Sequence, residues 1–566
     1  MDQTPLATPG AMLFECNQDL VLEAFRRGEF DYVDALGEVS EADFFRAITE
    51  RKILSKLAES YPSPRARHDV PLWVYLASNL SMRFHGEHHF HAFPYLVRSG
   101  GMIQAFGPAM GHKAIHPETG DVSLRCEGFN EKNHYDRQTP CEQDYLRKFA
   151  RDTEASRLES WFNRNVVGVF KQPQAFDAEE IFIGDATYLF VPDNPHYEGS
   201  ARLLFDEHHH PVGSAKVTPE QRARCVWRRC YKLVSLLHTN RAGKFFLYGG
   251  LRVTGGEEHE APVLYDLVEE FVRYHGPGVM KRLLLDRRFL DGAKIGHCKK
   301  DLGIEVLIPV RRDMDIYHDG VGMAEGRLLS FEVLPAPPVA IRGVPLHRPE
   351  RIRKREEARQ RTLAKKKAAA AQEAKAPPAP VQYLRSEVAT VEDLQTFTTC
   401  LVPLHAVVNR EIYSDGRQEY WVLLDTARIS HAVETRDLYR LRTSIEERHR
   451  QLKCFSDLER FFSRAFSLVV NQVVFILLMY SLLQWYWLRI GRPELLPRSR
   501  PHALAQLRPA LTVILIYYQN YVARLSPLHY QELLLTLRET ARRKILSKTR
   551  RLRRGLAHQL DQARAP

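Results

Sequence analysis

The segment EEIFIGDATYLFVP (179–192) decides the fold, because it predicts a strand that carries Asp185 in its middle. It is rich in β-branched and aromatic residues and ends at a proline followed by an aspartate, which is typical of a turn. Two further strands are predicted after it, at ARLLFDEHHHPVGSAKV (201–217) and KFFLYGGLRV (244–253). The three histidines of the former fall in its expected turn.

Residues 260–311 alternate between helices and strands. They predict a helix, a short strand, a second helix and a further strand, at EAPVLYDLVEEFVRYHG (260–276), KRLLLDRRFLDG (281–292), GAKIGHCKKDLG (292–303) and IEVLIPVR (304–311). Three strands, a helix, a strand, a helix and a strand is the order of an RNase H-like fold. The predicted class is therefore α/β, with a mixed sheet flanked by helices. Asp286 ends its strand, so it should meet Asp185 at one edge of this sheet.

A second informative stretch is YRLRTSIEERHRQLK (439–453), which predicts a helix. At about 100° per residue, four of its side chains share an arc of roughly 60°, and these are Tyr439, Arg442, Glu446 and Lys453. An adjacent apolar stripe, able to dock the helix on a core, consists of Leu441, Ile445 and Leu452. Glu447 points about 100° away from Glu446. The alternative is an ordinary solvated helix with i,i+4 charge pairs.

The spacing Tyr439-(2)-Arg442-(3)-Glu446-(6)-Lys453 resembles the YREK signature of DDE transposases of the insertion-sequence-four type at all four positions. The resemblance implies that Glu446 is the third catalytic, metal-binding carboxylate of an RNase H-like core. It implies that Arg442 and Lys453 hold DNA phosphates, and that Tyr439 supports or contacts the DNA near the cut.

Two upstream aspartates are implied by the same resemblance. Asp185, followed by Ala and Thr, fits the context of the first, and Asp286, followed by Arg-Arg-Phe, fits that of the second approximately. Asp193 and Asp291 are the alternatives, and both lie in predicted turns. The catalytic and metal-binding set is thus expected to be Asp185, Asp286 and Glu446.

Three carboxylates can hold two hard divalent cations, expected here to be Mg²⁺ with Mn²⁺ as a substitute. The implied activity is metal-dependent DNA strand cleavage and strand transfer in cut-and-paste transposition. The implied partners are double-stranded DNA, as transposon ends and target, and a second copy of the chain in a synaptic complex. Two alternatives stay open: an RNase H-like nuclease without strand transfer, and a catalytically inactive DNA-binding descendant.

Composition is consistent with a nucleic-acid partner. The 566 residues include 81 basic and 69 acidic side chains, a net charge of +12, which favours a polyanion. Eight cysteines without a CxxC pair, and a first segment without a basic n-region, predict a cytoplasmic protein. The resemblance to insertion-sequence transposases implies that it is bacterial and nucleoid-associated. The apolar segment 466–488 could be a membrane span, but its polar residues favour a core helix and no membrane partner. HGEHHFH (85–91) could bind a metal, but a polar helix end or loop is the simpler interpretation.

Five regions are expected along the chain. They are a helical N-terminal DNA-binding or assembly domain (1–150), the first part of the catalytic core (151–312), a β-rich insertion (313–430), the last part of the core (431–490) and a basic helical C-terminal region (491–566). Strands and hairpins are predicted at 310–335 and 398–427, with a turn at Asp415-Gly416. Within the insertion, 347–380 forms a basic arm, with eleven basic against four acidic residues from Arg348 to Lys375.

Overall fold

The computed structural model describes most of the chain. The described residues are 15–37, 41–68, 70–98, 101–106, 112–115, 118, 122–125, 141–170, 180–207, 209–213, 218, 222–334, 383–489, 511–519 and 521–549. The expected basic arm 347–380 lies outside them. The chain divides into two compact units. The larger consists of Met1–Ile308, Thr399–Val402 and Leu438–Leu556, and the smaller of Pro309–Thr398, Pro403–Asp437 and Ala557–Pro566.

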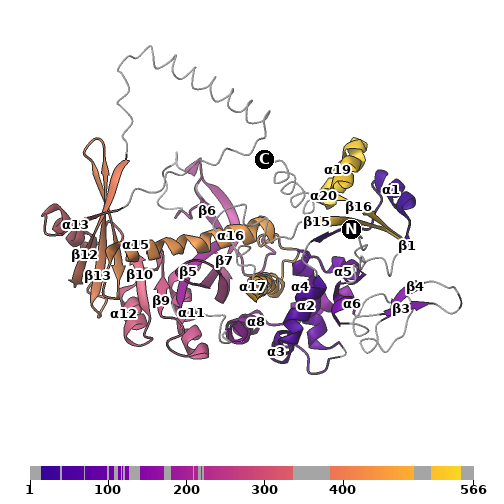
Figure 1. The fold of residues 1–566 in the computed structure, drawn as a ribbon, viewed down its shortest axis with the longest axis horizontal. Coiled ribbons are helices and arrows are strands. Elements are labelled where there is room, and N and C mark those ends of the chain that lie inside the picture. The colour runs from indigo at the N-terminus through magenta and orange to yellow at the C-terminus, as the bar shows by residue number, and fades with distance from the viewer. Residues whose placement is uncertain are drawn as a thin grey trace, which may run out of the picture. The chain divides into compact units, whose positions relative to one another are not determined.

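The larger unit is built on a mixed sheet (Figure 1). Its strands are β5 (Ile181–Val191), β6 (Ala201–Phe205), β7 (Val226–Thr239), β8 (Leu247–Gly255), β9 (Arg282–Leu284) and β10 (Glu305–Pro309). The strands β5, β7 and β8 pair antiparallel, whereas β9 is parallel to both β5 and β10. Helices α11 (Glu260–His275) and α12 (Gly292–Lys300) form the connections. The predicted α/β class, a mixed sheet flanked by helices, is confirmed.

The second strand of the antiparallel part is β7, which the sequence analysis missed. The strand predicted at the start of 201–217 is confirmed as β6, but its place as the second strand of the core is wrong, because β6 pairs with residues 226–230 at the start of β7 and not with β5. Residues 230–239 are buried throughout, although they include Lys232, Ser235 and His238. A strand buried on both faces has no polar alternation, and here interspersed polar residues also break the apolar run that would otherwise indicate it.

Close packing against α11 fixes the orientation of β5. The rings of Phe182 and Phe271 lie 4.8 Å apart. A Cβ atom on Gly184 would lie 2.7 Å from Leu264 and 2.8 Å from Leu285, so only glycine allows this approach. Phe182 and Gly184 thus face α11. Since successive side chains of a strand alternate, Asp185 is turned to the opposite face.

The apolar helix α17 (Phe466–Arg489) belongs to the core of the larger unit. Its segment Phe466–Tyr486 is long and apolar enough to cross a membrane, but 83% of the window is buried within the protein. Two of its buried polar residues have partners: Asn471 donates to the hydroxyl of Tyr75 (3.1 Å), and Ser481 accepts from the Tyr248 backbone N–H (3.2 Å). Such bonds remove the cost of burying polar groups. The core-helix prediction is confirmed.

Short helices precede the sheet in sequence. They are α2 (Glu41–Glu50), α3 (Ile53–Glu59), α4 (Leu72–Phe84), α5 (Phe93–Arg98), α6 (Gly101–Phe106), α7 (Gln143–Asp152), α8 (Ala155–Trp161) and α9 (Val167–Phe170), with a hairpin of β3 (His112–Ile115) and β4 (Val122–Arg125). An aromatic cluster joins them, in which the rings of Tyr75 and Phe149 are 4.4 Å apart and those of Tyr61 and Trp161 are 5.1 Å apart. Tyr75 also contacts Phe475 of α17, so these helices share one core with α17.

The two ends of the chain form a second sheet, in the order β1 (Glu15–Cys16), β16 (Tyr521–Leu525), β15 (Leu511–Tyr518) and β2 (Tyr32–Gly37) (Figure 1). Helices α1 (Gln18–Arg26), α19 (Pro527–Thr536) and α20 (Glu539–Lys548) accompany it, and its core includes Phe25, Ile514 and Tyr530. The prediction of purely helical terminal regions is therefore wrong at 32–37 and 511–525. The β-rich run LTVILIYY finds its partner almost 500 residues away, which local sequence cannot show.

The smaller unit contains β11 (Glu332–Val333), β12 (Tyr383–Leu394), β13 (Leu404–Tyr413), β14 (Gln418–Asp425) and the helix α13 (Asp315–Glu325). The predicted turn at Asp415-Gly416 is confirmed, with Gly416 at φ 81°. Strands predicted within 310–335 are wrong for 315–325, because Ile316, Gly320 and Ala324 are buried at helical spacing and Gly320 packs against Val408.

Candidate active site

Two aspartates meet on neighbouring parallel strands. Ile183 of β5 pairs with Leu284 of β9, so Asp185 and Asp286 each lie two residues farther along the same direction. Asp286 lies two residues past the end of β9 at Leu284 and directly precedes a 3₁₀ turn, Arg287–Phe289. The side chain of Asp185 is 13% exposed and that of Asp286 is 22% exposed.

The helix α16 (Thr443–Phe455) brings the third acid. The prediction of one continuous helix from Tyr439 to Lys453 is wrong, because α15 (Ala432–Tyr439) is followed by a 3₁₀ turn, Arg440–Arg442, before α16 begins. Ile445 and Leu452 are buried as predicted and hold α16 on the core. Glu446 is 53% exposed, and therefore lies at the accessible side of the helix.

Arg442 links the acids. Its guanidinium lies 3.7 Å from the Asp286 carboxylate and donates to Glu446 at 2.5 Å. Burial raises the pKa of Asp185 to about 7; the charge of Arg442 lowers it, and those of Glu446 and Asp286 raise it. The three carboxylates thus share one electrostatic environment, and a buried guanidinium compensates part of their repulsion. Burial opposes the charge on Arg442, but the neighbouring carboxylates still raise its pKa.

A comparison with protein families identifies the family of the chain. The family model described as Transposase DDE domain matches residues 179–482, more than half of the 566 residues. The chain belongs to the transposase DDE domain family. No curated protein matches the chain closely enough for comparison. The protein is thus a DDE transposase, from a family of nucleases and strand transferases that act on DNA and generally use divalent metal ions. The matched segment runs from β5 to α17 and includes all three acids.

Tyr439 and Lys453 contact the backbone near the two aspartates. The hydroxyl of Tyr439 donates to the carbonyl of Leu285 (3.3 Å), the residue directly before Asp286. Lys453 donates to the carbonyl of Tyr188 (2.5 Å) and pairs with Glu459 (2.9 Å). Both side chains therefore connect the helical segment 439–453 to backbone carbonyls close to the aspartates.

Sequence reasoning missed buried polar residues of α16. His449 lies between Ser235, at 3.1 Å from its Nε2, and Asp185, at 4.0 Å from its Nδ1. Burial and nearby cations lower the pKa of His449 to about 3, so its imidazole is neutral. Arg448 is fully buried, with its guanidinium 4.4 Å from the centre of the Phe246 ring. A signal was available, since positions 448 and 449 lie on the apolar stripe of Ile445 by helical spacing.

The alternatives for the aspartates have structural partners. Asp193 pairs with Arg202 (2.9 Å) and Arg229 (3.6 Å). Asp291 caps α12 by accepting from the backbone N–H of Lys294 (3.0 Å). Neither residue is among the charges that shift the pKa of Asp185. Asp185 and Asp286 are therefore the better pair.

Three histidines of the segment 85–91 contact residues that are distant in sequence. His85 is buried between Asp34 (3.4 Å) and Glu41 (3.3 Å), whose charges outweigh burial and raise its pKa well above the ordinary value. His88 hydrogen-bonds with the carbonyl of Ser456 (2.8 Å), and the ring of His89 packs on Phe462.

Among the residues that the structure describes, no set of three or more His, Cys, Asp or Glu side chains is arranged to hold a metal ion. In the acidic triad, the guanidinium of Arg442 pairs with Asp286 and Glu446. The donor chemistry nevertheless fits a hard divalent cation, because carboxylate oxygens are its preferred ligands. Burial raises the pKa of Asp185 to about 7, and the charges of Glu446 and Asp286 add to this rise. The metal-binding role of these residues stays a prediction.

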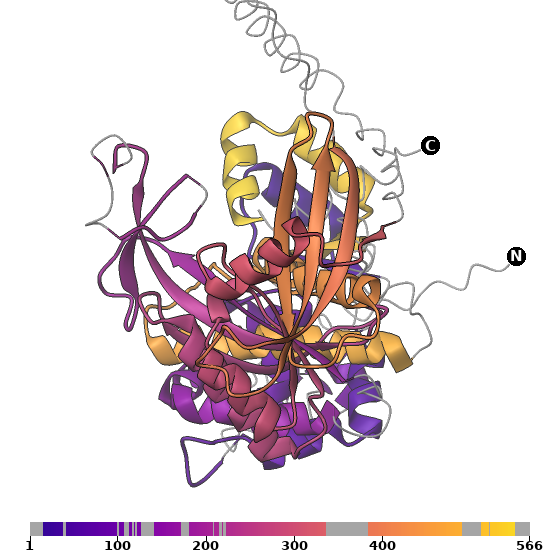
Figure 2. The ribbon, with the colours of Figure 1, turned by 90° about the vertical axis from the view of Figure 1, so that its left-hand side faces the viewer.

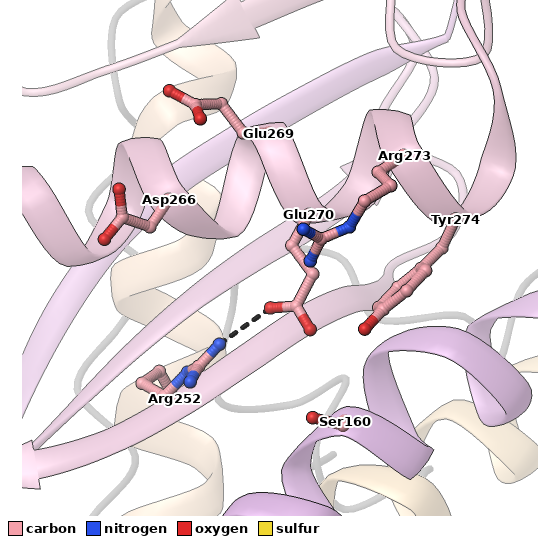
Figure 3. Close-up of a pocket in the computed structure, with 7 residues that line it drawn as sticks. All are labelled: Ser160, Arg252, Asp266, Glu269, Glu270, Arg273 and Tyr274. Carbon is pink, nitrogen blue, oxygen red and sulfur yellow. Dashed lines mark hydrogen bonds and ion pairs between the residues drawn. The ribbon is translucent and has the colours of Figure 1, made fainter.

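A separate polar pocket of about 380 Å³ lies between α11, α8 and β8 (Figure 3). It is lined by Ser160, Arg252, Asp266, Glu269, Glu270, Arg273 and Tyr274. Arg252 pairs with Glu270 at 2.7 Å. None of the acidic triad lines this pocket, which lies on the α11 face of the sheet, opposite to the face that carries Asp185.

Proposed function

We propose that this transposase is of the insertion-sequence-four type and that Asp185, Asp286 and Glu446 are its catalytic carboxylates. One observation carries the proposal: Asp185 on β5 and Asp286 just past the adjacent parallel strand β9 lie two residues beyond the paired Ile183 and Leu284, and Arg442 contacts both Asp286 and Glu446. The charged face of 439–453 has long-range partners, which an ordinary solvated helix does not need.

The three carboxylates would hold divalent cations, Mg²⁺ or its substitute Mn²⁺. Two such ions, when bound, activate an attacking water or 3′-hydroxyl and stabilise the leaving oxygen of a phosphoryl displacement. The protein contributes a preorganised acidic site: the backbone of β5 and β9 fixes both aspartates, and the Tyr439 hydroxyl holds the carbonyl before Asp286. His449, neutral and bonded to Ser235, packs beside Asp185 without adding charge.

Arg442 and Lys453 are proposed to contact DNA phosphates. In the DNA-free structure their charges are engaged by Asp286, Glu446 and Glu459. A phosphate brought to the site would offer Arg442 a bidentate partner, since a guanidinium matches phosphate geometry well. Tyr439 is proposed to support the backbone near the cut.

The wider assembly is also a proposal. The substrates would be the double-stranded ends of the element and a target duplex, bound by a homodimer in a synaptic complex and joined by strand transfer. The helical N-terminal region would bind DNA or assist assembly. The net charge of +12 supports a polyanionic partner.

The decisive experiment measures cleavage of a labelled duplex that carries the element's own ends, with Mg²⁺ or Mn²⁺, by wild type and by Glu446→Gln. Metal-dependent cutting at the ends should be lost in the variant while DNA binding persists. The matched control is Glu447→Gln, which changes the neighbouring carboxylate, paired with Arg450 at 2.7 Å. This control should cut like wild type.

The outcomes separate the alternatives. Equal cutting by wild type and Glu446→Gln would remove Glu446 from the metal site. Cutting without strand transfer to a target duplex would indicate a nuclease. Binding without cutting by wild type would indicate an inactive DNA-binding descendant.

A further inference from the structure

The strand β6 and the start of β7 form a two-stranded arm that extends beyond the sheet (Figure 2). Residues 226–230 of β7 pair with β6, whereas β5 pairs with 229–239 and β8 with 231–238. We define the β6–β7 arm as the described residues 201–207 and 222–230. It begins where β5 ends, since Val191 pairs with Arg229.

The arm is strongly basic. Its described residues contain five arginines and two acids: Arg202, Arg222, Arg224, Arg228 and Arg229 against Asp206 and Glu207. Asp193, from outside the arm, pairs with two of the arginines, Arg202 and Arg229. Among the described residues, no ion pair engages the other three. Internal salt bridges therefore leave much of the charge of the arm available for an anionic partner.

Large apolar side chains are exposed beside these charges. Trp227 is 40% exposed and Val226 is 54% exposed. The guanidinium of Arg202 lies 5.4 Å from the centre of the Trp227 ring. An exposed tryptophan leaves a large apolar ring in contact with water, which is unfavourable. A tryptophan flanked by arginines is therefore typical of a surface that contacts a partner.

The arm is continuous with the acidic site. Arg228 and Lys453 lie near the same ring, that of Phe190, at 5.0 and 6.0 Å from its centre. Lys453 belongs to the helix that carries Glu446. The exposed Arg288 lies 4.0 Å from Asp286. Burial raises the pKa of Tyr188 on β5, and the charge of Arg288 lowers it. A chain of cations thus leads from the carboxylates to the arm.

We propose that the β6–β7 arm is a DNA-binding element that holds the duplex next to the catalytic carboxylates. The proposal rests on the proposed function and adds to it the surface that grips the substrate. A two-stranded ribbon fits the major groove, which is about 12 Å wide. The arginines would contact phosphates, and Trp227 would pack against sugars and base edges.

Charge complementarity selects DNA over a second copy of the chain as the occupant. Two basic arms brought together would repel each other, whereas each phosphate contact releases counterions. The logarithm of the binding constant falls with the logarithm of the salt concentration, with a slope near −0.9 per phosphate contact. At about 0.1 M salt each contact therefore strengthens binding by roughly eightfold. Removing two contacts should therefore weaken binding by about 60-fold and lower the salt slope by about 2.

The test measures fluorescence anisotropy of a labelled duplex carrying the element's ends, across a salt series without divalent metal. The full-length variant Arg222→Gln with Arg224→Gln should show this loss in affinity and slope. Arg222→Lys with Arg224→Lys keeps the charge and should keep the slope. The matched control, Arg157→Gln with Arg273→Gln, removes two exposed arginines from α8 and α11 and should bind like wild type.

Unchanged affinity and slope in the Arg222/Arg224 glutamine variant, with wild type binding and cutting normally, would overturn the arm proposal alone. So would equal losses in the Arg157/Arg273 control. A Trp227→Ala variant whose oligomeric state changes while its DNA affinity does not would assign the arm to protein association instead. A wild type that binds no duplex would refute the proposed function as well as the arm, so the two failures are distinguishable.

Discussion

Replacing Asp185 by asparagine is expected to stabilise the metal-free transposase at about pH 8. In the folded protein burial raises the pKa of Asp185 to about 7, against its ordinary value of 3.8. The folded state therefore keeps a proton that the unfolded chain releases as the pH rises from 4 towards 7. Wild-type stability falls over this window, whereas asparagine, which cannot ionise, avoids the loss.

The magnitude follows from the two pKa values. Their difference corresponds to about 4 kcal/mol at pH values above both, since each pKa unit equals 1.36 kcal/mol. At about pH 5 the gain should shrink to about 2 kcal/mol or less, because the stability loss of wild type accumulates only from the ordinary pKa of 3.8 up to that pH. Other titrating groups cancel in the difference between variant and wild type.

Urea unfolding at both pH values, with Mg²⁺ omitted and then added, provides the measurement. Asp185→Asn should show the higher midpoint without metal, and most clearly at the higher pH. Added Mg²⁺ should stabilise wild type by mass action and stabilise the variant much less. A variant that is no more stable than wild type at the higher pH, or a gain that does not change with pH, would refute the burial of an ionisable Asp185 beside two acids.

Two further predictions concern the packing around the site. Gly184→Ala should destabilise the larger unit by about 1–3 kcal/mol, because the new methyl group would overlap Leu264 and Leu285; an unchanged urea midpoint would contradict this. Tyr439→Phe should cost about 1 kcal/mol through the lost hydrogen bond to Leu285, and it should slow single-turnover cleavage without weakening DNA binding. Equal cleavage rates would show that this bond does not help to position Asp286.

The sequence determined the acids and their local elements. Asp185 within a β-rich run, Asp286 at the end of a short apolar strand and Glu446 at fixed spacing from Arg442 were all visible locally. Strand and helix periodicity then placed the chain in the α/β class, and this was confirmed. Such features depend on residues close together in sequence, for which propensity and spacing are informative.

Contacts between distant segments were decided only by the tertiary structure. The strand β7 was missed because its buried polar residues find partners elsewhere, as Ser235 does in His449. The terminal sheet joins β2 to β15 across most of the chain, and no local pattern specifies that pairing.

The tertiary fold also decided the state of the acidic residues. The spacing from Arg442 to Glu446 indicated a pair, but only the fold brings Asp286 to the same guanidinium and buries Asp185 nearby. Burial and long-range charge set the protonation of a carboxylate, and both depend on the three-dimensional surroundings rather than on neighbours in sequence. The sequence by itself therefore predicted which acids form the site, and the fold determined how they interact.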